Sequence, residues 1–311
     1  GDYDIVLTVF DRDTLSPLSV LNEQGQPAAP TLTLGQVTLT RPRRPAELPE
    51  DNRLDISHMQ LVLATADFDR DQAAPGDSAY LTLMWQSNND SHYSTPYGNW
   101  VLTLLAPDNT AVARYSLPLP GYSWQEGDVW RSQHHLLLPA TLETGIYTWT
   151  VEWSSLSSDP IGQISIVAPS HTFTAPPVDV ETDIRLGGIA TLLGATCELA
   201  DLQPGTLFTV TLVWRAEETP SASYHVFLHL LGPEGGLIAQ SDSIPANWTR
   251  PTTGWLPGEY ITGTHTLAIP PDAPAGEYAL LAGLYLPGGE RLVTPNGETA
   301  VSLATFQIEA P

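Results

Sequence analysis

An internal repeat limits the fold of this 311-residue chain more than any other feature. The stretch GWLPGEYITGTHTLAIPPDAPAGEYALLAGLY at 254–285 has a counterpart at 123–154, SWQEGDVWRSQHHLLLPATLETGIYTWTVEWS. A separation of 131 residues aligns the two stretches at the following pairs, and brings His135 to within one residue of His265: Trp124 with Trp255, Gly127 with Gly258, Asp128 with Glu259, Pro139 with Pro270, Gly145 with Gly276, and Tyr147 with Tyr278. A period this long indicates duplicated domains and not a solenoid.

The similarity continues upstream in the same order. PGDSAYLTLMW at 75–85 matches PGTLFTVTLVW at 204–214, and LLAPDNTAVA at 104–113 matches LLGPEGGLIA at 230–239. Only the connecting segments differ in length. The chain therefore contains two copies of one unit.

Each copy consists of short segments rich in Val, Thr, Leu, Tyr and Trp, separated by Pro-Gly, Asp-Asn and Gly-Gly turns. LFTVTLVW and YLTLMW alternate apolar and Thr positions, which is typical of strands with one buried face. Strands joined by turns, without crossover helices, predict two packed antiparallel sheets in each copy. The predicted fold class is all-β, a tandem of immunoglobulin/fibronectin III-like antiparallel β-sandwiches.

Both copies also carry a Pro, a loop and then Gly-x-Tyr at the start of a strand. This pattern is typical of the tyrosine corner, in which the phenol bonds back to the loop backbone. We place Tyr147 and Tyr278 at such corners, as structural residues.

The N-terminal segment resembles the end of a third copy. GDYDIVLTVF at 1–10 matches GEYALLAGLY at 276–285, and TLTLGQVTL at 31–39 resembles AVSLATFQI at 300–308. Because two strands alone are marginal in water, we expect them to pack on the first complete domain or on a neighbouring chain. The predicted organisation is 1–44 as two strands of a preceding repeat plus linker, 45–168 as repeat 1, 169–177 as a Pro-rich linker, and 178–311 as repeat 2.

The charge of the chain narrows the choice of partners. The chain has 35 acidic residues and only 12 basic ones, all Arg, so the formal net charge is −23. Such a surface repels phosphate groups, so we expect no nucleic acid partner and no direct binding to anionic lipid. The single Cys197 lies among apolar residues and is expected to be an inert thiol.

The sequence has no apolar stretch of the roughly 18 residues that a transmembrane helix needs, and no signal-peptide pattern. We therefore expect the chain to be soluble as given. It begins at Gly1 without an initiator Met, which suggests a processed product or a piece of a longer polypeptide.

Residues 178–309 resemble a known module, through DIRLGGIATLLGA, PGTLFTVTLVWRA, YHVFLHLLGPEGGLIAQSD and PAGEYALLAGLYLPGGERL. It is a tandem β-sandwich module of uncharacterised bacterial proteins, where it typically follows a multi-spanning membrane region like a mannosyltransferase-type glycosyltransferase. The resemblance covers the second copy well and the first more loosely. It implies an extracytoplasmic appendage of a membrane protein, and it implies no catalytic residue.

Three motifs that suggest chemistry have simpler interpretations. GDSAY at 76–80 resembles the nucleophile block of some esterases, but the scaffold is all-β and the only DISH segment, at 55–58, precedes it. DFDRDQ at 67–72 lacks the Gly and Glu of a calcium loop. His225 and His229 are about 13 Å apart along a strand, too far to share one zinc ion. We predict no metal and no cofactor.

The candidate ligand residues are the aromatic ones in the two loops that differ between the copies. These loops are QSNNDSHYSTPYGNW at 86–100 and IPANWTRPTTGW at 244–255, and both mix aromatic rings with Asn, Ser, Thr and Arg. Rings with adaptable polar neighbours are typical of binding loops. The hypothesis is that Tyr93, Tyr97 and Trp100, or Trp248 with Arg250, contact a glycan or a protein; otherwise these rings cover sheet ends or seal the domain interface.

We therefore expect a non-catalytic extracytoplasmic module that binds a glycan or protein, or that acts as a spacer. The alternative is a regulatory or substrate-binding lobe of a membrane glycosyltransferase, or a glycosidase. A glycosidase needs two carboxylates facing one cleft, and Asp128 and Glu259 are repeat-equivalent turn residues in different domains. A stalk of identical modules predicts no concave pocket.

Overall fold

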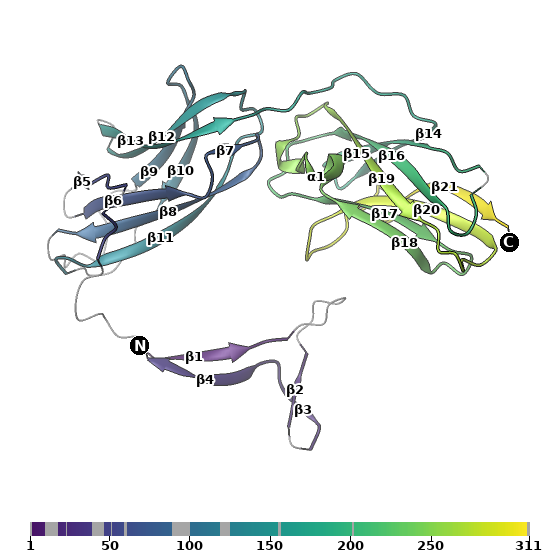
Figure 1. Ribbon diagram of the computed structural model, residues 1–311, viewed down its shortest axis with the longest axis horizontal. Coiled ribbons are helices and arrows are strands. Elements are labelled where there is room, and N and C mark those ends of the chain that lie inside the picture. Colours follow the sequence, from purple (N-terminus) through teal and green to yellow (C-terminus); the bar gives the residue numbers. More distant parts are fainter. Residues whose placement is uncertain are drawn as a thin grey trace.

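The computed structural model describes residues 2–9, 18–22, 24–38, 47–50, 52–58, 61–88, 100–118, 125–154, 157–200 and 202–309. Strands dominate, and they form two β-sandwiches and a two-stranded ribbon (Figure 1). The predicted fold class, all-β with tandem immunoglobulin/fibronectin III-like sandwiches, is confirmed. Within the described residues, none of the helices has the length and apolar character that a bilayer crossing requires.

The first sandwich spans residues 56–166. One sheet has the order β11-β8-β6-β5, and the facing sheet has the order β10-β9-β12-β13-β7, with β7 parallel to β13. The bounds are β5 (Ile56–His58), β6 (Leu61–Phe68), β7 (Gln72–Ala73), β8 (Ser78–Ser87), β9 (Trp100–Leu105), β10 (Ala111–Leu117), β11 (Val129–Leu137), β12 (Gly145–Ser154) and β13 (Ser157–Ile166).

The second sandwich spans residues 180–308. Its sheets have the orders β14-β15-β16-β19 and β18-β17-β20-β21. The bounds are β14 (Val180–Leu186), β15 (Ala190–Cys197), β16 (Leu207–Ala216), β17 (His225–Leu231), β18 (Leu237–Ser243), α1 (Pro245–Trp248), η1 (Thr252–Gly254), β19 (Tyr260–Ala268), β20 (Gly276–Tyr285) and β21 (Val301–Ile308).

The two sandwiches share one strand order. We count seven strands of the repeat, from β6 in the first sandwich, leaving out β7, and from β15 in the second; β5 and β14 pair with the first of these strands. In each sandwich the first, second and fifth strands form one sheet, and the third, fourth, sixth and seventh form the other. Pairing registers refine the sequence alignment: His134 lies opposite Leu81 on β8, and His265 lies opposite Val210 on β16. His134, and not its neighbour His135, is therefore the counterpart of His265.

Alternation along the strands accounts for the cores. In β16 and β8 apolar side chains at every second position point inward, and Thr lies between them. The inward residues include Leu81, Leu83 and Leu212, all fully buried. Each sandwich is thus an independent hydrophobic core between two sheets.

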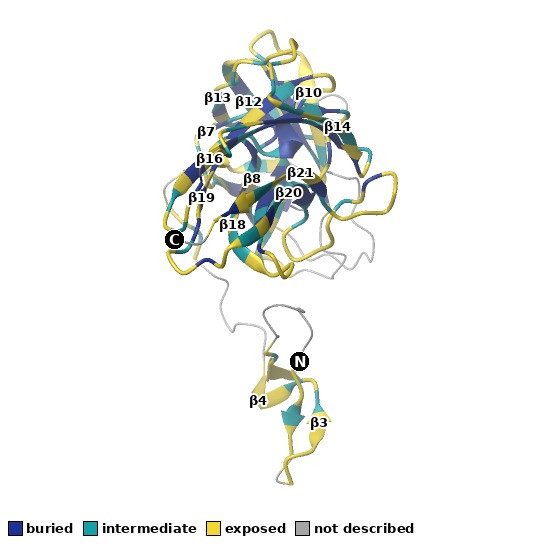
Figure 2. Ribbon diagram, turned by 90° about the vertical axis from the view of Figure 1, so that its right-hand side faces the viewer, coloured by how far each residue is buried: buried dark blue, intermediate teal, exposed yellow. Residues whose placement is uncertain are grey.

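The N-terminal ribbon pairs β1 (Asp2–Leu7) with β4 (Leu32–Thr38), and a short hairpin pairs β2 (Val20–Leu21) with β3 (Pro27–Ala29). Every residue of β1 and β4 is exposed, and Figure 2 shows β4 in the exposed colour. The ribbon therefore does not pack on the first sandwich, which was one of the two arrangements expected from the sequence.

Candidate functional site

The two sandwiches meet at a pair of glycines. Thr253 Oγ1 donates a buried hydrogen bond of 2.6 Å to the carbonyl oxygen of Gly76. A Cβ on Gly76 would lie 2.2 Å from Gly254 N, and a Cβ on Gly254 would lie 2.4 Å from Pro75 O. Only glycine permits two backbones to approach this closely, so the glycine pair fixes where the sandwiches touch.

A cleft of about 580 Å³ opens beside this contact; we call it the inter-sandwich cleft. The first sandwich contributes the β7–β8 turn and β11, and the second contributes the segment before β17 and the loop between β18 and β19. The lining residues are Ala74, Gly76, Asp77, Ser78, His135, Leu137, Ser221, Ala222, Ser223, Ile244, Trp248, Thr249, Pro251 and Thr253. A volume of this size suits a small molecule or a short oligomer.

Trp248 is the main aromatic group of the cleft. Trp248 is 61% exposed, although tryptophan is usually highly buried. It ends α1, which is in fact a left-handed turn: φ is 53° at Ala246, 55° at Asn247 and 70° at Trp248. Left-handed backbone at residues other than glycine is strained, and such strain is common at functional sites.

The turn that carries Trp248 is held from several sides. Trp248 N donates to the carbonyl of Ile244, and Thr249 Oγ1 donates to the carbonyl of Ala246 at 2.6 Å. On its other side the indole meets the His225 ring edge to face, with centroids 5.5 Å apart. Burial lowers the pKa of His225, so this ring is uncharged at neutral pH. The exposed indole is thus presented in a defined orientation.

Polar groups also line the cleft. His135 lies on β11 and its ring contacts that of Tyr80, with centroids 5.1 Å apart and the ring planes tilted by 34°. Ser223 Oγ is buried and has no hydrogen-bond partner among the described residues. Buried hydroxyls normally have partners, so this group is available to a ligand or to water. An aromatic face with hydroxyl and imidazole groups around it can recognise a polar ligand that also has an apolar face.

Behind the cleft, a buried carboxylate holds the connecting segment against the second sandwich. Glu259 is completely buried; Arg250 Nη2 lies 2.6 Å and His171 Nδ1 lies 2.8 Å from its Oε1. Leu256 N donates to the other oxygen, and Tyr260 N donates to the carbonyl of Thr172. The predicted linker 169–177 is therefore attached to the second sandwich through residues 171 and 172. We call this group the Glu259 clamp.

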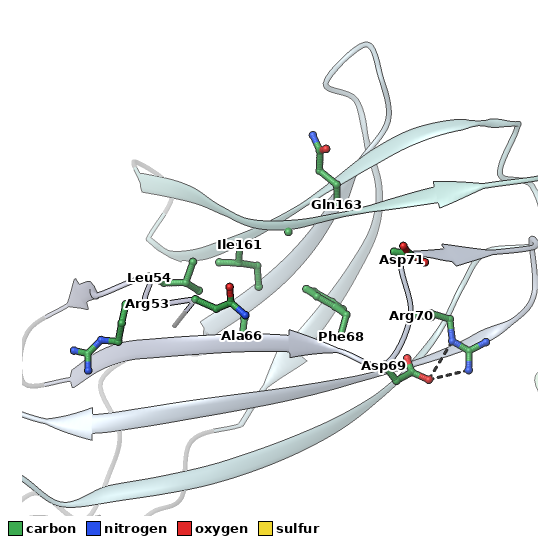
Figure 3. Close-up of a pocket in the computed structure, with 11 residues that line it drawn as sticks. Arg53, Leu54, Ala66, Phe68, Asp69, Arg70, Asp71, Ile161 and Gln163 are labelled. Atoms are coloured by element: carbon green, nitrogen blue, oxygen red, sulfur yellow. Dashed lines mark hydrogen bonds and ion pairs between the residues drawn. The ribbon is translucent and has the colours of Figure 1, made fainter. Parts of the chain in front are cut away.

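A second hollow, of about 600 Å³, lies at the open side of the first sandwich (Figure 3). Phe68 of β6 and Ile161 of β13 point into it from the two facing sheets, and Asp69 and Asp71 lie at one end. Asp69 pairs with Arg70 at 2.8 Å, and that hydrogen bond holds the pKa of Asp69 below its ordinary value. A glycosidase general acid needs a raised pKa, so Asp69 is unsuited to that role.

The ligand residues proposed from the sequence have different positions in the structure. Trp248 lines the inter-sandwich cleft, as described. Trp100 begins β9 and is buried, packing edge-on against Trp85 with ring centroids 4.8 Å apart. Its assignment as a ligand contact is wrong, because the ring belongs to the core. Arg250 directs its guanidinium to Glu259, with 13% of the side chain exposed, and acts in the clamp. Tyr93 and Tyr97 lie outside the described residues.

The tyrosines assigned to corners make the backbone contacts that such corners require. Tyr147 Oη donates to the carbonyl of Glu143 at 3.0 Å, and Tyr278 Oη donates to the carbonyl of Pro274 at 2.7 Å. In both cases the acceptor lies four residues before the tyrosine. The hydroxyls thus fix the loop that leads into β12 and β20.

The remaining motifs have structural roles. Asp77 Oδ2 accepts a hydrogen bond from Ala74 N, a turn cap that Thr206 Oγ1 repeats in the second sandwich by accepting from Gln203 N. Asp69 Oδ1 accepts from Tyr80 N. No group of three or more potential metal ligands occurs among the described residues. Burial raises the pKa of the Cys197 thiol, which lowers its reactivity.

Comparison with known proteins adds little. No family model and no curated protein matches the chain. Among solved structures, the native conformation of E. coli alpha-2-macroglobulin shares 13% identity over 96% of this chain and 19% of that chain, with a TM-score of 0.24. Dimeric latent PorU from Porphyromonas gingivalis shares 12% identity over 86% of this chain and 21% of that chain, with a TM-score of 0.22. The chain thus spans about a fifth of these structures, and such scores transfer no function.

The cleft could not be predicted from the sequence, but the burial of Trp100 could have been. The spacing that aligns 104–113 with 230–239 places Trp100 on Val226, which is a buried strand residue. No comparable signal exists for the cleft, because its two walls come from separate domains, one wall from residues 74–137 and the other from residues 221–253.

Proposed function

We propose that the chain is a non-catalytic binding module that holds a carbohydrate in the inter-sandwich cleft. The observation that supports this most directly is the exposed indole of Trp248, carried on a strained turn at the rim of a cleft. Sugars combine an apolar C–H face with a ring of hydroxyls. The indole of Trp248 can pack against the C–H face, and the side chains of His135, Ser223 and Thr249 can form hydrogen bonds with the sugar hydroxyls.

Strain and the unpartnered hydroxyl support the same function. Left-handed backbone at three consecutive residues other than glycine costs free energy, and a ligand contact gives a reason for keeping it. The Ser223 hydroxyl is buried at the cleft wall without a partner among the described residues, which favours a polar ligand.

The resemblance supports a proposal for the location. We propose that the module is an extracytoplasmic appendage, in line with its likeness to a module that follows a mannosyltransferase-like membrane region. In that setting it would present sugar or protein to the membrane enzyme, or regulate it. The rigid glycine contact between the sandwiches and the Glu259 clamp also suit a spacer. The acidic surface, with net charge −23, favours neutral or cationic partners over nucleic acid.

The test is titration of the protein with a panel of neutral oligosaccharides, read by calorimetry. We expect Trp248→Ala to weaken binding about tenfold or more, because loss of an aromatic face costs on the order of 1 kcal/mol or above. Phe173→Ala is the matched control, since Phe173 is an exposed aromatic residue that does not line the cleft. The proposal fails if the unaltered protein binds no sugar, or if binding survives Trp248→Ala.

A further inference from the structure

The β1–β4 ribbon reproduces the last two strands of both sandwiches in its pairing register. Each of the three strand pairs places a tyrosine two residues after the repeat glycine, and this tyrosine lies opposite an apolar residue of the partner strand. The opposed pairs are Tyr3 with Val37, Tyr147 with Ile164, and Tyr278 with Phe306.

The three pairs also share an irregularity. In the ribbon, Ile5 lies opposite Gly35 and Val6 lies opposite Thr33, so Leu34 is passed over. The same step passes over Ile161 in the first sandwich and Leu303 in the second. A β-bulge that recurs at the equivalent position in several strand pairs is a feature of the repeat and not an accident of one pair. Its presence in all three pairs identifies β1 and β4 as the sixth and seventh strands of a further copy of the repeat.

The burial of the equivalent side chains differs completely. In the ribbon, Tyr3 is 56%, Ile5 49% and Leu34 59% exposed. Their counterparts Tyr278 and Leu280 are fully buried, and Leu303 is 6% exposed. Leu7 and Leu32 are also exposed where the second sandwich has buried residues. We call these five ribbon residues the ribbon face.

The sandwiches show what covers this face. In the second sandwich β20 pairs with β17 along its other edge, and the β15-β16-β19 sheet lies over the inward side chains. In the ribbon, β1 pairs with β4 alone among the described strands, so its other edge is open. An exposed apolar face next to an open strand edge is a site for strand addition.

We propose that the ribbon face and the open edge of β1 are a docking surface for a polypeptide that carries the first five strands of the same repeat. One strand, equivalent to β17, adds antiparallel to β1. A sheet equivalent to β15-β16-β19 covers the ribbon face. The surface thus takes a strand-forming partner with the pattern of residues 178–275, and this role is independent of the cleft.

The test supplies these strands from the chain itself. Because Gly1 aligns with Gly276 and with Gly145, residues 178–275 or 52–144 can be placed directly before Gly1 without changing the junction. Hydrogen exchange of the β1 and β4 amides is then measured in each extended chain and in the unaltered chain. We expect protection to rise about 100-fold or more, as for strands within a folded sheet. Leu34→Asp should abolish that rise, because it places a charge on the covered face.

Three results would overturn the proposal. The first is that neither donor protects β1, since two donors that differ in sequence make simple misfolding of one an insufficient explanation. The second is protection that survives Leu34→Asp, which would show that the ribbon face is not what is covered. The third is light scattering that finds the unaltered chain to be a dimer dispersed by Leu34→Asp, in which case a second copy occupies the face.

Discussion

Gly254→Ala tests the contact that joins the two sandwiches. The three atoms nearest to the added methyl group belong to Pro75 and Gly76 of the first sandwich, at 2.4, 3.4 and 3.6 Å. The backbone of Gly254 is not left-handed, so alanine is tolerated locally. The added methyl group therefore clashes with Pro75 of the first sandwich, while the backbone conformation at residue 254 accommodates alanine.

The size of the effect follows from these distances. Ordinary contact with Pro75 O begins at 3.4 Å, so the two backbones must move apart by about 1 Å from the initial 2.4 Å. Such a shift would lengthen the 2.6 Å bond from Thr253 to Gly76 beyond hydrogen-bonding distance. Leaving a buried donor and acceptor without partners costs about 1–3 kcal/mol. We expect the free energy of unfolding to fall by this amount.

Two measurements check this expectation. Urea unfolding gives the loss of stability, and spin labels at Val112→Cys and Leu237→Cys, both on exposed sites of different sandwiches, give the distance distribution between them. Gly236→Ala is the matched control, because its Cβ would meet no atom within 4 Å. If Gly254→Ala keeps the stability and the narrow distance distribution of the unaltered chain, the glycine contact does not fix the sandwiches and the reasoning is refuted.

Three further predictions concern the second sandwich. Glu259→Gln should lower the free energy of unfolding by about 3 kcal/mol, because Arg250 would be left without its buried counter-charge; a loss below about 1 kcal/mol in urea unfolding would contradict the clamp. Tyr278→Phe should cost about 1–2 kcal/mol through the lost bond to Pro274, and an unchanged denaturation midpoint would argue against the corner. Burial lowers the pKa of His265, so the folded state takes up its proton less readily than the unfolded state and stability should fall as the pH drops below about 6.5. His265→Gln should flatten that part of the pH profile, and an unchanged slope would contradict the assignment.

The fold could be predicted from the sequence because the same strand and turn patterns occur in both copies of the repeat. Strand positions follow from alternation between neighbouring residues, and turns follow from glycine and proline, so both are encoded locally. The tyrosine corners at Tyr147 and Tyr278 belong to this class, because the acceptor lies only four residues away. The pairing of the N-terminal strands was also predictable, since the repeat carries it.

Side-chain roles at strand ends were less predictable. Trp100 ends one polar segment and Trp248 lies within the other, yet Trp100 is buried against Trp85 and Trp248 is exposed. The difference depends on whether the facing sheet covers the ring, which local composition does not reveal. Arg250 resembled a binding residue for the same reason, and its true partner is Glu259.

The amino-acid sequence alone thus determined the all-β class and the corners, which depend on residues close together in the chain, and the duplication, which is visible because the same local patterns recur in the same order. The tertiary structure alone decided the glycine contact, the inter-sandwich cleft and the clamp between His171 and Glu259. The contact joins Gly76 to Thr253, and the clamp joins residues 88 positions apart. The glycine contact depends on how two completed sandwiches fit against each other, and the clamp depends on how the connecting segment lies against the second sandwich; no periodicity in the sequence records either fit.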